Sequence, residues 1–174
     1  MPTDIVNPRD LISPKVDDND QVGLGLDVVE IARIEAVLAR SASFKRIFSA
    51  EEQAYCDATS NPATHYATRF AAREAVAKAL GTGLYVGGVL PKDIEVCRSH
   101  TGKPYVRLSG RVAELARELG VLELPISLSY THQEAVACAM AITRGSQSAA
   151  QARKDPMEEL TKQFKSARAM LDEL

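Results

Sequence analysis

The stretch RFAAREAVAKALGTG, residues 69–83, predicts a helix that packs very closely against another part of the molecule. Alanine is the best helix former, and its small side chain lets a neighbouring backbone approach. Asn61 and Pro62 are residue types typical of an N-cap and a first helical position, and Gly81 of a C-terminal stop. We therefore expect one long helix from Pro62 to about Leu80. Its close neighbour could be the same chain or another copy.

Four charged residues, Arg69, Arg73, Glu74 and Lys78, lie within this alanine-rich helix. At the helical repeat, Glu74 and Lys78 point about 40° apart among small residues, whereas Arg69 and Arg73 lie well round the helix. One interpretation is an ordinary pair of opposite charges one turn apart on a surface. The other is a Mg²⁺-binding carboxylate followed by a phosphate-binding lysine, because Mg²⁺ takes one or two carboxylates and completes its shell with phosphates and water.

A second carboxylate stands in VGLGLDVVE, residues 22–30. Apolar residues alternate there with Gly23 and Gly25, which predicts a strand with one bare face that a backbone or a ligand can approach. The apolar period becomes helical from Val28, so Asp27 falls at the junction. Asp27 is a candidate metal ligand, and with Glu30 it also matches a helix N-cap of the capping-box type. One carboxylate has lone pairs for both roles.

The remaining patterns predict a small α+β domain over residues 21–143. Ser49 and Glu52 match a capping box at the start of a helix, and Gly120 ends a later helix. Strands are expected in DIEVCRS and PYVRLS around the HTGK loop, and in PISLSYTHQEAVACAMAI around a turn near Thr131–Glu134. We expect a largely antiparallel sheet packed against the long helix.

Both ends of the chain are expected to lie outside this domain. Residues 1–20 carry three prolines and several aspartates, which is typical of a mobile arm. Residues 144–174 are predicted to form a linker followed by an amphipathic helix that starts at Asp155 and Pro156 and carries an apolar stripe to Leu174.

Composition excludes several classes of protein. The net charge of −2 gives no overall basic field for nucleic acid, and no apolar segment is long enough to span a membrane. The three scattered cysteines and the absence of a signal-peptide pattern fit a reducing cytoplasm. The three histidines lack a zinc-ligand spacing, and the GKP triplet lacks the spacing of a phosphate-binding P-loop.

Four motifs occur in a fixed order: GLGLDVVEIARIE, RFAAREAVAKALGTG, DIEV…TGKPYV and ISLSYTH. Together they resemble the holo-[acyl-carrier-protein] synthases, the small bacterial branch of the 4′-phosphopantetheinyl transferases, over residues 22–143. The resemblance implies the fold of that superfamily. It also implies Mg²⁺-dependent transfer of the 4′-phosphopantetheine arm of coenzyme A to a serine of apo acyl carrier protein, with release of adenosine 3′,5′-bisphosphate. It further implies a homotrimer with active sites between subunits.

The resemblance also assigns roles to individual positions. It implies Asp27 and Glu74 as metal ligands and Glu74 and Lys78 as catalytic residues, and it leaves the general base open between Glu74 and a water on the metal. The implied coenzyme A contacts are Arg69, Lys78, Gly81, Gly102, Lys103, Pro104 and, from the neighbouring subunit, His132. Arg33 matches a carrier-binding position.

Spacing extends the carrier-binding surface beyond Arg33. Arg40 lies seven residues later on the same expected helix and therefore shares its face, and Lys45 and Arg46 follow shortly after. We expect these four cations to meet an acidic helix of the carrier. The competing interpretation is that they form an ordinary solvated face.

The sequence also permits a non-catalytic module that only binds acyl carrier protein, although docking alone would not require Asp27, Glu74 and Lys78. His132 could likewise be an ordinary surface residue of a turn. Arg73 replaces the lysine that many members of the family carry before the helix glutamate, and guanidinium and ammonium geometries are not interchangeable. Since Arg73 points away from Glu74, we expect no catalytic role for it.

Overall fold

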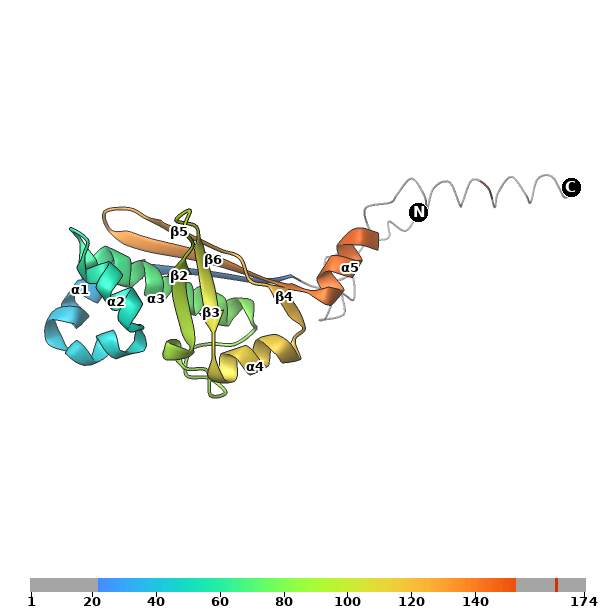
Figure 1. Ribbon diagram of the computed structural model, residues 1–174, viewed down its shortest axis with the longest axis horizontal. Helices are drawn as coiled ribbons and strands as arrows, with labels where there is room; N and C mark the ends of the chain where they lie inside the picture. Colours follow the sequence, from blue (N-terminus) through green and yellow to red (C-terminus); the bar gives the residue numbers. More distant parts are fainter. Residues whose placement is uncertain (1–21, 153–164, 166–174) are drawn as a thin grey trace, which may run out of the picture. The chain divides into compact units, whose positions relative to one another are not determined.

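The computed structural model describes residues 22–152 and Lys165 (Figure 1). Residues Val22–Thr143 form one compact unit, and the helix α5 (Arg144–Ala152) belongs to a separate one. The prediction of a linker directly after residue 143 is wrong for residues 144–152. These residues form α5, which begins at the residue after the end of β6. The predicted arm at 1–20 and the predicted amphipathic helix from Asp155 lie outside the described residues, apart from Lys165.

The larger unit is an α+β domain, as predicted. Its elements, in chain order, are β1 (Gly23–Glu30), α1 (Ile31–Arg40), the 3-10 helix η3 (Ala42–Ile47), α2 (Ala50–Asp57), α3 (Pro62–Ala79), the 3-10 helix η4 (Pro91–Asp93), β2 (Ile94–Arg98), β3 (Pro104–Leu108), α4 (Gly110–Glu118), β4 (Val121–Glu123), β5 (Ile126–Tyr130) and β6 (Glu134–Thr143). Within the described part of the chain, no helix is long and apolar enough to cross a membrane.

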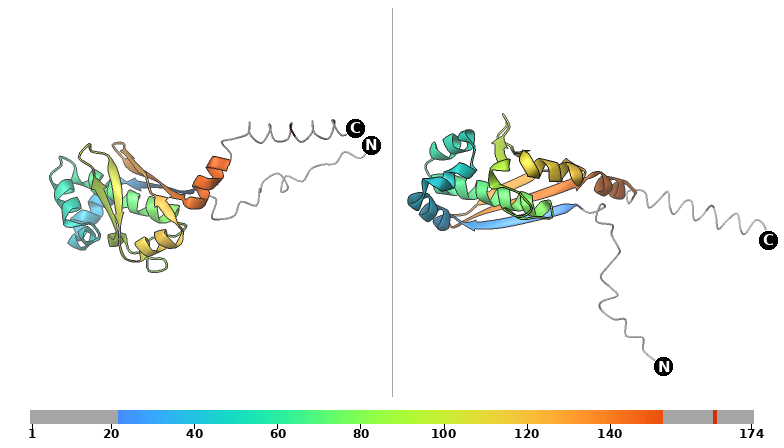
Figure 2. Two further views of the ribbon diagram at one scale, coloured as in Figure 1. Left: turned by 45° about the vertical axis from the view of Figure 1, so that its right-hand side comes forward. Right: turned by 90° about the horizontal axis from the view of Figure 1, so that it is seen from below.

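The main sheet is antiparallel and is organised around β6. One edge of β6 pairs with the whole length of β1, from Glu30 opposite Glu134 to Gly23 opposite Ala141. The other edge pairs first with β5 and then with β4. Strands β2 and β3 form a separate hairpin. Figure 2 shows α3 running along one face of the main sheet, with the hairpin and α4 on that same side.

Along most of β1 and β6, the small residues face α3 and the large apolar residues face outward. The inner face carries Gly23 and Gly25 on β1 and the buried alanines at 135, 137, 139 and 141 on β6. A Cβ atom on Gly25 would collide with the carbonyl oxygen of Ala75, and one on Gly23 with that of Ala79. The bare face predicted for β1 is therefore occupied by the backbone of α3. The large residues of the outer face stay exposed, among them Leu24, Leu26, Val28 and Met140.

The helix ends agree with their predicted signals, with one exception. Ser49 and Glu52 form the capping box of α2, Asn61 accepts from the amide of Thr64, and Gly81 follows α3 with a φ of 71°. The predicted N-cap at Asp27 is wrong. Strand β1 continues past it, and Glu30 holds the cap position of α1 without a capping side-chain bond. The amide of Ile31 instead donates to the carbonyl of Gln133, 2.8 Å away, in the β5–β6 turn.

The close contact between α3 and β1 predicts that Gly25 cannot carry a side chain. We expect Gly25→Ala to lower the free energy of unfolding by about 3 kcal/mol, because the added methyl group forces the helix and strand apart. Gly83→Ala is the matched control, since its new Cβ would have Val86 as its nearest neighbour at an ordinary 3.5 Å. Urea unfolding monitored by circular dichroism measures both. Equal stability of the two variants would contradict this packing.

Candidate functional site

The structure brings Asp27, Glu74 and Lys78 together where α3 crosses β1. The ammonium of Lys78 donates to Oδ1 of Asp27 at 2.7 Å and to the carbonyl of Leu26 at 3.0 Å. Asp27 is 16% exposed and Lys78 48%. In the described region Lys78 thus pairs with the strand carboxylate, not with Glu74 one turn earlier. The surface-pair interpretation of Glu74 and Lys78 is therefore wrong, and the three side chains form one cluster.

The electrostatics of Glu74 reflect its neighbours. Burial raises the pKa of its carboxyl, the negative charge of Asp27 raises it further, and the positive charge of Lys78 opposes both effects. Two carboxylates therefore share a partly desolvated site that contains one cation. Such a site favours a further positive charge, because the negative charge of Asp27 disfavours ionisation of Glu74.

The donor set fits a magnesium ion that also binds a substrate. No group of three or more His, Cys, Asp or Glu side chains that could hold a metal ion occurs among the described residues. A fully protein-built cage, as zinc or calcium requires, is therefore not what this cluster offers. Mg²⁺ commonly uses one or two carboxylates and takes its other ligands from phosphates and water. Asp27 and Glu74 are suited to that arrangement.

Arg69 lies elsewhere on α3, in a cleft of about 290 Å³ between α2 and the β2–β3 hairpin. Its side chain is 4% exposed, and its Nε has no hydrogen-bond partner although it is 3.8 Å from Oε1 of Glu52. Nine residues separate Arg69 from Lys78, which is about 13 Å along a helix. The predicted nucleotide contact therefore lies well away from Lys78, and about 7.5 Å along the helix from the candidate metal ligand Glu74, five residues after Arg69.

Sequence reasoning missed the aromatic residue that organises this cleft. The ring of Tyr55 on α2 lies 4.3 Å from the guanidinium carbon of Arg69 and 4.8 Å from that of Arg98. The edges of the cleft also include Tyr105 and Arg107, the latter paired with Glu95. No local pattern joins Tyr55 to Arg98, since the two come from separate elements. The cleft thus presents two guanidinium groups beside an aromatic ring.

The remaining predicted coenzyme A contacts lie in loops or directly beside them. Gly102, Lys103 and Pro104 close the β2–β3 hairpin, next to Arg98 and Tyr105 of the cleft. Gly102 shapes this turn through its positive φ of 82° and through the hydrogen bond that its backbone N–H donates to the carbonyl of Ser99. Gly81 comes directly after Leu80, the C-cap residue of α3, and three residues after Lys78.

His132 is exposed in the turn between β5 and β6. Three residues of strand, about 10 Å, separate Asp27 from Glu30, which pairs with Glu134, and His132 lies beyond that pair. One copy of the chain therefore does not bring His132 to the cluster of Asp27, Glu74 and Lys78.

The four predicted carrier-binding cations differ in availability. Arg33, Arg40 and Arg46 are exposed on α1 and η3. Lys45 instead contacts both carboxylate oxygens of Asp57, at 2.8 and 2.9 Å. The charge of Lys45 is therefore largely compensated within the chain.

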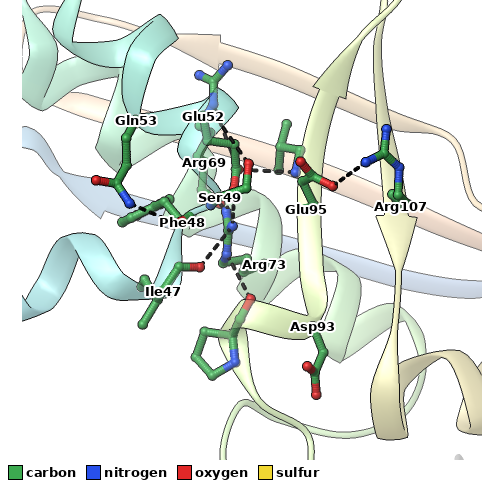
Figure 3. Close-up of polar contacts among 12 residues, drawn as sticks. Ile47, Phe48, Ser49, Glu52, Gln53, Arg69, Arg73, Asp93, Glu95 and Arg107 are labelled. Carbon is green, nitrogen blue, oxygen red and sulfur yellow. Dashed lines mark hydrogen bonds and ion pairs between the residues drawn. The ribbon is translucent and has the colours of Figure 1, made fainter.

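Arg73 points away from Glu74, as predicted. It is fully buried and pairs with Glu52 of α2 (Figure 3). The sequence identified Glu52 only as a helix cap. The structure shows that the same carboxylate also pairs with Arg73 and accepts from the amide of Val96. Neither residue faces the site on β1.

Comparison with known proteins agrees with this arrangement. Residues 23–141 match the family model described as the 4′-phosphopantetheinyl transferase superfamily. A holo-[acyl-carrier-protein] synthase of Moorella thermoacetica is 46% identical over 117 residues, which are 67% of this chain and 90% of that protein. One from Anaeromyxobacter sp. is 47% identical over 129 residues, 71% of this chain and 96% of that protein.

Solved structures give the same result. The holo-[acyl-carrier-protein] synthase of Neisseria meningitidis superposes with a TM-score of 0.64 at 30% identity, covering 70% of this chain and 98% of that one. The Helicobacter pylori enzyme, solved in complex with coenzyme A, gives a TM-score of 0.60 at 29% identity and covers 68% and 99% of the two chains. The chain therefore belongs to the 4′-phosphopantetheinyl transferase superfamily.

Proposed function

We propose that this protein is a holo-[acyl-carrier-protein] synthase, which transfers the 4′-phosphopantetheine arm of coenzyme A to a serine of apo acyl carrier protein. The observation that carries this proposal is the cluster of Asp27, Glu74 and Lys78, retained in a chain about 46% identical to proteins of that name. A module that merely bound the carrier would have no use for two carboxylates that share a partly buried site. The free cysteines at 56, 97 and 138 suit a reducing cytoplasm.

The reaction is a phosphoryl transfer, for which positioning and charge neutralisation matter most. The serine oxygen forms a bond to the phosphorus that carries pantetheine, and the bond from that phosphorus to the bridging oxygen breaks, so that adenosine 3′,5′-bisphosphate leaves. Asp27 and Glu74 would hold Mg²⁺, which when bound neutralises the diphosphate and orients it. Lys78 places a positive charge beside the same phosphates. Glu74 is the group of this cluster that is suited to accept the serine proton.

Coenzyme A would extend from this cluster toward the cleft that contains Arg69. The guanidinium of Arg69 would meet a nucleotide phosphate, and the hairpin loop Gly102–Pro104 would lie along the adenine. Gly81 allows close approach of the ligand at the end of α3. Tyr55 and Arg98, which line the same cleft, support this placement by adding an aromatic ring and a second cation.

We further propose that the protein works as a homotrimer with shared sites. The outer face of the β1–β6 sheet supports this, since exposed large apolar residues gather where a monomer would carry polar ones. Leu24 is 66% exposed, Leu26 56% and Val28 49%. Burying this face against other copies would let His132 of one subunit complete the site of the next.

The metal assignment is tested by removing each carboxylate. Asp27→Ala and Glu74→Ala should each reduce the rate of transfer at least about 100-fold. Each variant lacks one ligand of the Mg²⁺ ion that would neutralise the diphosphate. Chelation of Mg²⁺ from the native protein should have the same effect. Mass spectrometry of the carrier measures transfer across a Mg²⁺ titration. Glu118→Ala, which removes an exposed carboxylate from α4, is the matched control. Near-normal turnover in both folded site variants would refute the metal site.

Carrier docking is tested by reversing one exposed charge. Arg33→Glu should raise the KM for the carrier about tenfold and spare that for coenzyme A, because a rim charge acts mainly on encounter with an oppositely charged partner. Added salt should reduce the difference in the KM for the carrier between the native protein and Arg33→Glu, because salt screens exposed charges over about 8–10 Å at physiological ionic strength. Arg117→Glu on α4 is the control for a change of net charge. If Arg33→Glu raised the KM for coenzyme A instead, the proposed contact between Arg33 and the carrier would be wrong.

The trimer is tested with a charge on the outer sheet face. Leu24→Glu should dissociate the assembly in sedimentation experiments at micromolar concentration, because an unpaired carboxylate is costly to bury. Transfer activity should fall in parallel, since His132 would no longer reach a neighbouring site. Leu119→Glu, which changes another exposed leucine at the end of α4, should leave assembly intact. A native protein that is both monomeric and fully active would rule out the shared site.

A further inference from the structure

Arg73 is fully buried (Figure 3), and each of its five N–H groups donates a hydrogen bond inside the protein. Its Nε donates to the carbonyl of Pro91 at 2.9 Å, and its Nη2 to that of Ile47 at 3.1 Å. Its Nη1 donates to the carbonyl of Arg69 at 3.1 Å. The two remaining N–H groups pair with the Glu52 carboxylate, at 2.9 and 2.6 Å. One guanidinium thus joins α3 to the end of η3, to α2 and to the start of η4.

Glu52 completes the buried charge pair. Its oxygens also accept from the backbone amides of Ser49, at 2.9 Å, and Val96, at 3.1 Å. A buried ion pair is stable only when its desolvated atoms find further hydrogen bonds, and both partners meet that condition here. Removing the Arg73–Glu52 pair altogether would therefore disturb the core. A change that keeps both charges but removes the hydrogen bonds from Arg73 to backbone carbonyls would measure the effect of those hydrogen bonds alone.

The bond to Ile47 matters because of what surrounds it. Residues 45–48, which we call the docking segment, include Arg46, an exposed member of the proposed carrier-binding surface. The side-chain amide of Gln53 donates to the carbonyls of Lys45 and Phe48, at 3.0 and 2.9 Å. Arg73 holds the carbonyl between them, that of Ile47. Two side chains, one from α2 and one from α3, therefore fix the backbone of this segment.

We infer that Arg73 is a positioning residue, which holds the docking segment at a fixed place relative to the catalytic helix α3. The inference rests on the proposed function, because it assumes that the segment meets the carrier. Glu74, the next residue, faces the site on β1, so adjacent positions of one helix serve the reaction centre and the docking surface. A lysine could keep the charge pair with Glu52. Its single ammonium could not also reach the carbonyls of Ile47, Pro91 and Arg69 in the planar arrangement of a guanidinium.

The test is Arg73→Lys in the full-length protein, with apo carrier protein, coenzyme A and Mg²⁺. We expect the KM for the carrier to rise about five- to tenfold, because only part of the free energy of the lost hydrogen bonds is transmitted to carrier binding. The kcat and the KM for coenzyme A should stay within about twofold, in keeping with uniform loss of carrier binding. Amide hydrogen exchange should accelerate in residues 45–48 and remain unchanged in the middle of α3.

Two further variants make the result decisive. Gln53→Leu removes the other anchor of the docking segment without touching α3, and it should raise the KM for the carrier in the same way. If Arg73→Lys does not fold, an unchanged KM for the carrier in Gln53→Leu would still overturn the proposal, because the fixed place of the docking segment would then not matter for carrier binding. Arg117→Lys makes the same chemical change on α4, where the guanidinium donates to a carbonyl of its own helix, and should have no effect.

The outcomes separate the two proposals. An unchanged KM for the carrier, or a fall in kcat instead, would overturn the positioning role and leave the transferase function intact. A native protein that transfers nothing would refute the proposed function, and the docking role with it.

Discussion

The close approach of α3 to β1 and β6 is the contact on which the rest of the domain depends. Helix and strand can meet at backbone distance because Gly23 and Gly25 carry no side chain and because β6 presents only alanines to the helix. That contact brings Lys78 to the carboxylate of Asp27 and places Glu74 within its electrostatic influence. A wider separation, filled by larger side chains, would leave three isolated charged groups in place of one cluster.

Much of this arrangement could be predicted from local sequence, since it depends on short-range signals. The caps of α2 and α3, the stop at Gly81 and the antiparallel pairs each follow from residues a few positions apart. The prediction at Asp27 was wrong because a capping-box spacing also occurs by chance in a strand, and here the pairing of β1 with β6 extends the strand to Glu30. The short β4 escaped notice because three residues give too little pattern. The start of α5 did so because its composition resembles that of a linker.

The charged residues show where sequence reasoning ends. The grouping of Glu74 with Lys78 on one side of the helix, and of Arg69 with Arg73 on another, follows from helical geometry. The partners do not, because they come from distant parts of the chain. Glu52 lies 21 positions before Arg73. The ring of Tyr55 on α2 contacts the guanidinium of Arg98 on β2. A side chain that satisfies a local rule, as Glu52 does at its cap, can also carry a long-range role that the rule conceals.

On β1 and β6 the small residues face inward and the large apolar residues face outward. This arrangement affects how the protein behaves at low chain concentration. If the outer face is covered only in an assembly, folding and association are one linked equilibrium, and the free energy of the folded state depends on the logarithm of the chain concentration. Dilution would then expose Leu24, Leu26 and Val28 to water and to other apolar surfaces. Newly made chains would pass through that state before finding their partners, so the rate of synthesis would influence how many reach the assembled form.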